Sequence, residues 1–336
     1  MSRIFCFGEL LLRFSPELRG KWLRQSRMPV YIGGAELNTA TALAKWKVPV
    51  DYCTALPDNY LSKEIYEELS KRNVRTDPII FSGDRIGSYY LPQGSDLKNA
   101  GVIYDRAHSS FSELRPGQID WDAALNNVSW FHFSAISPAL NQNVAAVCKE
   151  IVEAASGKGI TISVDLNYRS KLWQYGKKPN EIMQPLVEHC DVIMGNIWSA
   201  HDLLGISIDP DIHNCKSKSK YLEHAGRTSE NVMLMFPKCT SVANTFRFDH
   251  GDQINYYASL HTRDSHFVSR EFSTNNVVDK VGSGDCFMAG LIYGFYHKLA
   301  LREIIDFATA AAFNKLFIRG DATTSTVEEI KKTHGE

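Results

Sequence analysis

The sequence predicts an α/β domain built on a mainly parallel sheet, with a small β-sheet beside it. Short runs of β-branched and aromatic residues alternate with longer helical patterns, which is typical of crossover units around a parallel sheet. The 336 residues include 44% apolar and 22% charged side chains, an ordinary globular mixture. The 37 basic and 38 acidic side chains almost cancel. This balance lacks the basic excess that nucleic-acid binding needs, so no nucleic-acid partner is expected.

The elements of the main domain follow this alternation along the chain. Core strands are expected at 4–7, 50–54, 129–134, 160–165, 192–194 and 232–236. Helices are expected at 35–46, 63–72, 143–156, 182–189, 285–298 and 301–317. Consecutive short strands at 242–248, 254–258 and 267–272 suit an antiparallel edge on the parallel sheet.

Two segments, 11–32 and 83–106, lack helical periodicity but contain strand-like pieces at 86–91 and 101–104. We expect them to form a discontinuous β-lid over a domain made of residues 1–10, 33–82 and 107–336. Exposed lid strands could pair between subunits, which predicts a homodimer or higher homo-oligomer.

The cysteines and the apolar segments bear on where the protein works. Seven cysteines are scattered without a C-x-x-C pair, the pattern of reduced thiols in a cytoplasmic protein. No segment approaches the roughly 20 apolar residues of a membrane span, so no membrane partner is expected. The histidines show no metal-ligand spacing, and no protein-bound metal is predicted.

The strongest local signal is Asp279-Lys-Val-Gly-Ser-Gly-Asp285, a glycine turn that runs into an apolar helix. Glycines at 282 and 284 allow close approach of a ligand, and the first N–H groups of the helix point outward, which suits phosphate. Asp285 could cap this helix or accept the proton of an attacking hydroxyl. A second glycine turn, Gly33-Gly-Ala-Glu-Leu-Asn38, enters an Ala-rich helix.

The order and separation of these two motifs resemble the ribokinase-like, or pfkB, family of small-molecule kinases. The resemblance implies a ribokinase-like three-layer fold, ATP as phosphate donor and Mg²⁺ held mainly through the phosphates, with a monovalent cation possible. It implies that Asp285 is the catalytic base and that Gly282, Ser283 and Gly284 stabilise the transferring phosphoryl group. Asn167, Asn196 and Asp279 would lie near the nucleotide, together with Gly282 and Gly284.

Further segments resemble the 2-keto-3-deoxygluconate kinases of that family, which implies a sugar-acid substrate phosphorylated at its terminal hydroxyl. By this resemblance the substrate would contact Gly34, Asn38, Tyr89, Tyr104, Arg106, Arg169 and Asp321. Guanidinium groups suit a carboxylate because they donate two parallel hydrogen bonds. Each of these residues also has a structural alternative to substrate binding: the tyrosines could pack in the lid, Arg169 could form a surface ion pair and Asp321 could form a turn.

Two segments depart from the family pattern on the nucleotide side. The usual Asn-x-x-Glu is Asn196-Ile-Trp-Ser199, and a glycine-bearing turn is replaced by Phe236-Pro-Lys-Cys-Thr-Ser-Val242, where Lys238 could compensate in charge. These losses leave two alternatives open: a kinase of a neutral ketose such as fructose, and a relative that binds a sugar acid without catalysis.

Overall fold

The main sheet of the computed structural model is parallel over most of its width. The structure describes residues 2–17, 22, 27–93, 101–214, 217–251 and 253–335. In these residues the strand order is β14-β13-β12-β11-β10-β9-β1-β4, and β15 also pairs with β13. The parallel strands are β4 (Val50–Cys53), β1 (Arg3–Phe7), β9 (Val128–Ser134), β10 (Thr161–Asp165), β11 (Val192–Gly195) and β12 (Ser241–His250). The antiparallel edge is β13 (Gln253–Thr262), β14 (His266–Val268) and β15 (Phe272–Thr274).

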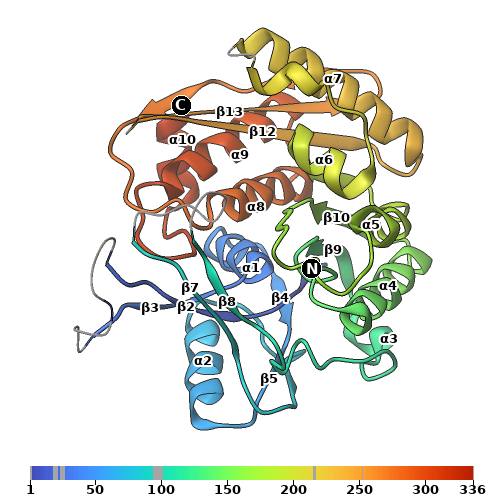
Figure 1. Ribbon diagram of the computed structural model, residues 1–336, viewed down its shortest axis with the longest axis vertical. Coiled ribbons are helices and arrows are strands. Elements are labelled where there is room, and N and C mark those ends of the chain that lie inside the picture. Colours follow the sequence, from blue (N-terminus) through green and yellow to red (C-terminus); the bar gives the residue numbers. More distant parts are fainter. Residues whose placement is uncertain are drawn as a thin grey trace.

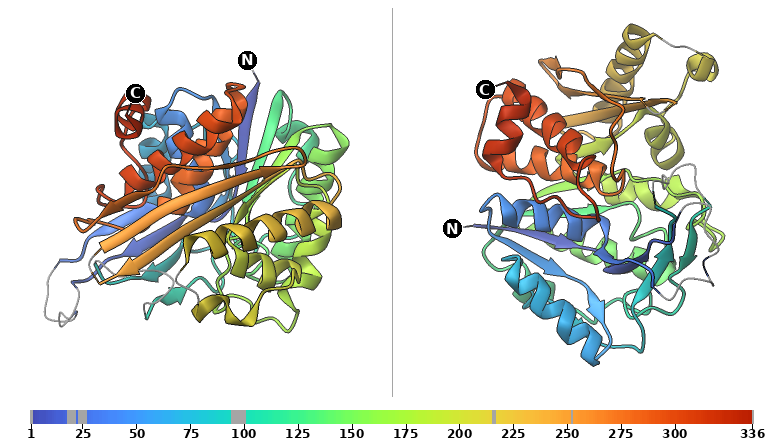
Figure 2. Two further views of the ribbon diagram at one scale, coloured as in Figure 1. Left: turned by 90° about the horizontal axis from the view of Figure 1, so that it is seen from above. Right: turned by 90° about the vertical axis from the view of Figure 1, so that its left-hand side faces the viewer.

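Helices cover both faces of this sheet and complete three layers (Figures 1 and 2). One apolar cluster joins the sheet to α1 (Ala35–Lys45), α2 (Tyr60–Lys71), α8 (Ser283–Tyr296), α9 (Leu301–Lys315) and α10 (Val327–His334). A second cluster joins the other face to α3 (Trp121–Ala124), α4 (Gln142–Gly157), α5 (Pro179–Val187) and α6 (Ile197–Leu204). Helix α7 (Lys218–Met235) packs on β12 and β13, and a 3-10 helix spans Pro210–Asn214.

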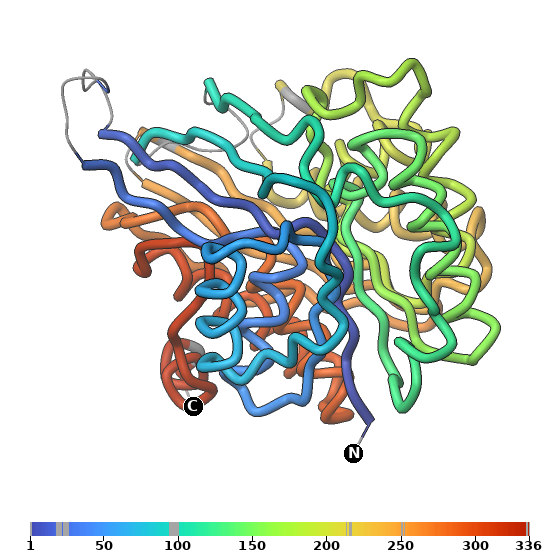
Figure 3. Tube along the Cα trace, turned by 90° about the horizontal axis from the view of Figure 1, so that it is seen from below, coloured from blue at the N-terminus to red at the C-terminus, as the bar shows by residue number. Residues whose placement is uncertain are grey.

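A second sheet of four strands lies beside the core, and we call it the small sheet. Its order is β3 (Val30–Gly33), β2 (Leu11–Phe14), β7 (Gly87–Tyr90) and β8 (Ile103–Asp105). Figure 3 shows β2 and β3, drawn in blue, running outward from the body of the molecule. Strand β5 (Ala55–Leu56) follows β4 in the chain and pairs with β6 (Ile80–Phe81) in a separate two-stranded sheet. Residues 18–21, 23–26 and 94–100 of the expected lid segments are outside the described residues.

The structure confirms the α/β fold and corrects three elements. The strand expected at 232–236 is wrong, because these residues end helix α7, with Val232 buried and Leu234 77% exposed. The strand expected at 242–248 belongs to β12, which runs parallel to β11 before it turns back into β13. The strand expected at 267–272 divides into β14 and β15, and a further helix, α10, follows the two expected at the C-terminal end.

The expectations about membrane-crossing segments and about the cysteines can be compared with the structure. Among the described residues, no helix combines the length and apolarity of a membrane-crossing segment. Six described cysteines are free, buried thiols: Cys6, Cys53, Cys148, Cys190, Cys239 and Cys286. Cys215 lies outside the described residues.

Candidate active site

A cavity of about 630 Å³ opens at the carboxyl ends of the parallel strands. Ligands of open α/β sheets bind at this edge because the loops after neighbouring strands meet there. The small sheet borders the cavity on one side, and the N-termini of α1 and α8 border it on another. Twelve residues predicted from the sequence line it: Gly34, Asn38, Tyr89, Tyr104, Arg106, Asn167, Arg169, Asn196, Gly282, Ser283, Gly284 and Asp285.

The turn at 282–285, which we call the anion turn, forms the first turn of α8. Gly282 caps the helix in the left-handed region, at φ 80°. A β-carbon there would lie 1.8 Å from the carbonyl oxygen of Asp321, so only glycine fits. Ser283 turns away from the cavity and donates from Oγ to the carbonyl oxygen of Ala312 at 3.0 Å. At Gly284 the space of a β-carbon is empty, which leaves the N–H groups of the helix terminus open to an anion.

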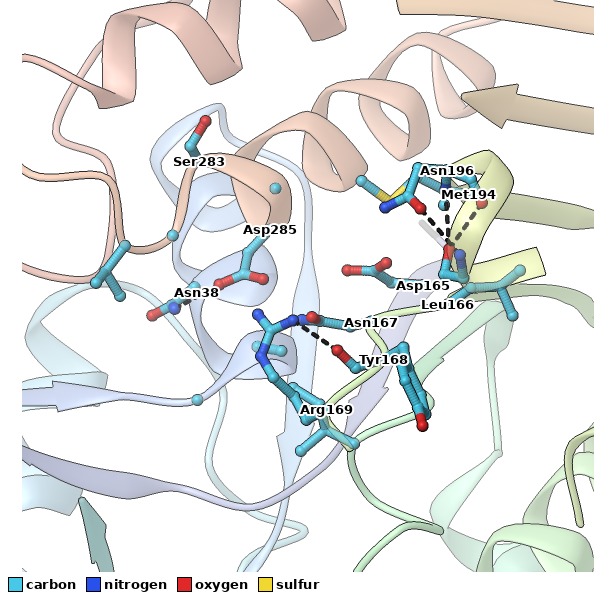
Figure 4. A pocket seen from close by; sticks show the side chains of 18 of the residues that line it. Asn38, Asp165, Leu166, Asn167, Tyr168, Arg169, Met194, Asn196, Ser283 and Asp285 are labelled. Atoms are coloured by element: carbon cyan, nitrogen blue, oxygen red, sulfur yellow. Dashed lines mark hydrogen bonds between the residues drawn. The ribbon is translucent and has the colours of Figure 1, made fainter. Parts of the chain in front are cut away.

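Asp285 lies at the mouth of the anion turn and is only 8% exposed. Burial raises the pKa of Asp285 to about 7, and the hydrogen bond that it accepts from Asn38 opposes part of this rise. Nδ2 of Asn38 donates to Oδ2 of Asp285 at 2.7 Å (Figure 4). A carboxyl group with a pKa near neutrality and a side open to the cavity is suited to general-base catalysis.

Arg169 reaches the cavity from the loop after β10. Its guanidinium group points towards Asp285 (Figure 4). Nη1 of this group donates a 2.9 Å hydrogen bond to the carbonyl oxygen of Tyr168. Arg169 is half-buried, and its positive charge lowers the pKa of Asp285 against the larger effect of burial. Asn167, two residues earlier in the loop, lines the same wall.

Arg106 is buried against Glu9 rather than extended alone into the cavity. Its Nε donates to Oε2 of Glu9 at 2.6 Å, and Oγ of Ser109 donates to Oε1 of the same carboxylate. Tyr89 and Tyr104 stand beside this pair with ring centroids 6.3 Å apart. The structure therefore brings both predicted arginines to the cavity, but the charge of Arg106 already has a partner.

Asp279 and Asp321 are the two predicted residues that do not line the cavity. Both carboxylates pair with Arg13 of β2 behind the anion turn, each at 2.7 Å. Tyr89 donates from its hydroxyl to Oδ2 of Asp321 at 3.1 Å. The N–H group of Val281 donates to Oδ1 of Asp279 at 3.1 Å, so this carboxylate holds the segment that leads into the turn.

The segment that was expected near the nucleotide, Asn196-Ile-Trp-Ser199, begins helix α6. Asn196 caps helix α6 by accepting hydrogen bonds from the N–H groups of Trp198 and Ser199. Ser199 stands where the pattern has glutamate, and its Oγ accepts from the N–H group of Asn196, which completes a capping box. Lys238 does not line the cavity, because it lies near Asp191 and Ser156 on another part of the molecule.

Seven of the charged residues that line the cavity were not predicted as site residues: Glu9, Glu36, Asp165, Lys171, Asp202, Arg247 and Lys280. Glu36 is buried and accepts from the N–H and hydroxyl groups of Ser134. Burial raises the pKa of Glu36. Asp165 ends strand β10, Glu9 comes two residues after β1, and Glu36 comes two residues after the Gly33-Gly34 turn, positions that could have marked them.

Comparison with known proteins identifies the family to which this site belongs. Residues 1–325 match the model of the pfkB family of carbohydrate kinases. The chain belongs to this family. The solved structure of a 2-dehydro-3-deoxygluconokinase from Thermotoga maritima is 32% identical, covers 100% of both chains and has a TM-score of 0.89. A 2-dehydro-3-deoxygalactonokinase of Haloferax volcanii is 26% identical over 98% of this chain and 96% of its own length. A 2-dehydro-3-deoxygluconokinase of Bacillus subtilis is 24% identical over 94% of this chain and 90% of its own.

This pfkB kinase is therefore a carbohydrate kinase, and kinases of the family use ATP, typically with Mg²⁺. The open N–H groups of the anion turn fit a phosphate, as the empty space at Gly284 shows. Asp165, at the end of β10, has carboxylate oxygens of the kind that Mg²⁺ prefers, whereas Oδ1 of Asn196 already accepts two hydrogen bonds. The described residues contain no group of three or more His, Cys, Asp or Glu side chains arranged to bind a metal.

Proposed function

We propose that this pfkB kinase transfers the γ-phosphoryl group of ATP to the terminal hydroxyl of 2-keto-3-deoxygluconate or a closely related keto-deoxy sugar acid. The observation that carries the proposal is the half-buried guanidinium group of Arg169, which faces Asp285 across the cavity (Figure 4). A neutral sugar makes no use of a cation at that place, whereas a carboxylate accepts two parallel hydrogen bonds from it. The names of the relatives support the same class of substrate.

The remaining substrate contacts come from α1 and the small sheet. Oδ1 of Asn38 is buried without a hydrogen-bond partner among the described residues, and it can accept a hydrogen bond from a sugar hydroxyl. The hydroxyphenyl rings of Tyr89 and Tyr104 form the wall opposite. We propose that the small sheet acts as the lid, because closure over the sugar keeps water from the phosphoryl group.

In the reaction, the hydroxyl oxygen of the sugar acid attacks the γ-phosphorus while the bond from phosphorus to the leaving ADP oxygen breaks. The ionised carboxylate of Asp285 takes the hydroxyl proton. The N–H groups of the anion turn at Gly282, Ser283 and Gly284 donate to the oxygens of the transferring group, where negative charge is concentrated. Mg²⁺ bound to the phosphates would offset their charge, and Asp165 would hold it, with Asn167 and Asn196 lining the cavity nearby.

ADP release from the purified protein tests this function. The substrates are 2-keto-3-deoxygluconate, 2-keto-3-deoxygalactonate, gluconate, fructose and ribose, each with ATP and Mg²⁺. We expect turnover of the keto-deoxy acids and about 100-fold or greater loss in Asp285→Asn, because a positioned general base contributes roughly 10²–10⁴-fold. Binding of the acid by calorimetry should survive in this variant.

Three results would separate the alternatives. Preferred turnover of fructose would identify a neutral-ketose kinase. Binding of the acid without ADP release by the unmodified protein would identify a sugar-acid-binding relative. Wild-type turnover by Asp285→Asn would remove the general-base assignment.

We infer that the enzyme is a cytoplasmic homodimer or higher homo-oligomer that associates through the small sheet. Its edge strands β3 and β8 carry Val30 and Ile103, which are 48% and 52% exposed. An apolar strand edge is a template for pairing with a second copy. Sedimentation velocity should show a dimer, and Ile103→Lys should shift it to the monomer. A wild-type monomer at micromolar concentration would contradict this inference.

A further inference from the structure

Lys315 lies beneath the anion turn with no exposed surface. It is the last residue of α9, and its Nζ donates a 2.9 Å hydrogen bond to the carbonyl oxygen of Ile318. Its Cε lies 3.4 Å from the point that a β-carbon on Gly282 would occupy. Lysine is almost never fully buried without a charged partner, so this ammonium group has a specific environment.

The charges around Lys315 balance. Burial lowers the pKa of Lys315, and the negative charges of Asp279 and Asp321 offset only part of this fall. Arg13 pairs with the same two carboxylates at 2.7 Å. The cluster thus contains two cations and two anions. Without the lysine it would be left with a net negative charge directly behind a turn that has to hold phosphate.

Removing the lysine side chain would affect the surroundings of the anion turn in two ways. The carbonyl oxygen of Ile318 would lose its donor. The buried negative charge would also repel the phosphates, because Coulomb energies are large where water is excluded. The carbonyl oxygen of Ile318 and the nearby negative charges of Asp279 and Asp321 are surroundings that also suit a dissolved monovalent cation.

We propose that the ammonium group of Lys315 is a built-in monovalent cation that positions the anion turn, so that phosphoryl transfer by this chain needs no dissolved potassium or ammonium ion. The proposal rests on the kinase function above. It addresses whether the enzyme needs a monovalent cation, a question that the sequence left open. Lys315 touches neither sugar nor nucleotide. It acts through Gly282 and Ile318 and is a positioning residue.

The first test is the response of the wild-type enzyme to cations. ADP release is measured at constant ionic strength, with tetramethylammonium chloride replaced stepwise by potassium chloride. We expect the rate to change less than about twofold, a negligible change in barrier. Activation of the wild type by about tenfold or more would overturn the proposal, whatever the fate of any variant.

The second test removes the lysine side chain and asks whether a dissolved cation can replace it. Lys315→Ala leaves a cavity beside the carbonyl oxygen of Ile318, and we expect a loss of about 100-fold without added cation and recovery of about tenfold or more with ammonium or potassium chloride. In thermal unfolding, potassium chloride should raise the Tm of Lys315→Ala but not that of the wild type. Lys71→Ala, which removes the exposed last residue of α2, is the matched control and should behave as wild type.

The outcomes distinguish this proposal from the kinase function itself. Wild-type rates in Lys315→Ala without cation, or losses that no cation reverses together with an unchanged Tm, would leave Lys315 a packing residue only. If the unmodified protein releases no ADP from any sugar acid even with potassium chloride, the kinase function fails. The Tm comparison then still tests the cation site by itself.

Discussion

The side-chain amide of Asn38 in α1 donates a 2.7 Å hydrogen bond to Oδ2 of Asp285 in α8, across 247 residues of chain. The backbone of α8 is joined to α1 as well, since Oγ1 of Thr39 donates to the carbonyl oxygen of Asp285 at 3.2 Å. The two glycine turns that stand far apart in the sequence therefore form one site. The hydrogen bond also controls the proton affinity of the proposed base, which makes its effect measurable.

The activity should depend on the ionisation of Asp285. Because burial raises its pKa to about 7, kcat/KM should fall as the pH decreases through this value. In Asn38→Ala the ionised form loses a hydrogen bond, so this acid limb should move upward by about one pH unit. Asn59→Ala removes the cap of α2 instead and should leave the limb in place. An acid limb that does not move in Asn38→Ala would contradict the role of the hydrogen bond.

The stability of Asp285→Asn should depend on pH in a predictable direction. In the unfolded chain Asp285 titrates near 3.9, so between about pH 4 and 7 only the folded wild type keeps the proton. The free energy of unfolding of the wild type therefore falls as the pH rises, while asparagine cannot ionise. The advantage of Asp285→Asn should be greater at about pH 8 than at about pH 4 by roughly 4 kcal/mol.

Urea unfolding at both pH values measures this difference. Asp122→Asn, at a carboxylate whose side chain is 87% exposed, is the control and should show little pH dependence. An equal advantage of Asp285→Asn at both pH values would show that its carboxyl titrates normally.

The glycines of the anion turn should differ in their tolerance to alanine. At Gly282 the β-carbon would meet the carbonyl oxygen of Asp321 at 1.8 Å in a left-handed backbone, so Gly282→Ala should lower the Tm and abolish activity. At Gly284 the same atom meets nothing within 4 Å, so Gly284→Ala should keep the Tm. Its methyl group would instead enter the phosphate space and raise KM for ATP. Similar Tm values for the two variants would contradict this description of the turn.

The two predicted arginines should respond differently to leucine. Arg106→Leu leaves the buried carboxylate of Glu9 unpaired and should destabilise the fold by about 3–5 kcal/mol. Arg169→Leu should change stability little but raise KM for the sugar acid about tenfold or more, since a charge-assisted pair is lost. KM for a neutral sugar should hardly change. Equal effects of Arg169→Leu on acid and neutral sugar would remove the carboxylate assignment.

The sequence predicted the site where short-range patterns define it. Glycine before a helix and polar residues after a strand have local causes, so the turn at Gly282 and the loop with Asn167 and Arg169 could be placed at one edge of the sheet. The same reasoning failed at Val232, because a short apolar run can be either a strand or a buried helix segment. In α7 the buried residues recur with the period of a helix, and this period, rather than the apolar run, indicates the correct element.

Pairings between distant residues could not be predicted. Arg106 and Glu9 are 97 residues apart, and Arg13 and Asp279 are 266 apart, yet each pair is buried and in contact. Nothing in the local pattern of these residues indicates which opposite charge they meet. An arginine predicted as a substrate contact and an aspartate predicted near the nucleotide were therefore found in ion pairs that only the folded chain reveals.

Arg13 ties the small sheet to the segments behind the anion turn. It belongs to β2 of that sheet, yet both of its ion-pair partners stand behind the anion turn. The part of the sheet at Arg13 is therefore held against Asp279 and Asp321. In the lid closure proposed above, the strands farther from Arg13 would move most, and the backbone that would hold the phosphate would keep its place while the entrance changes width.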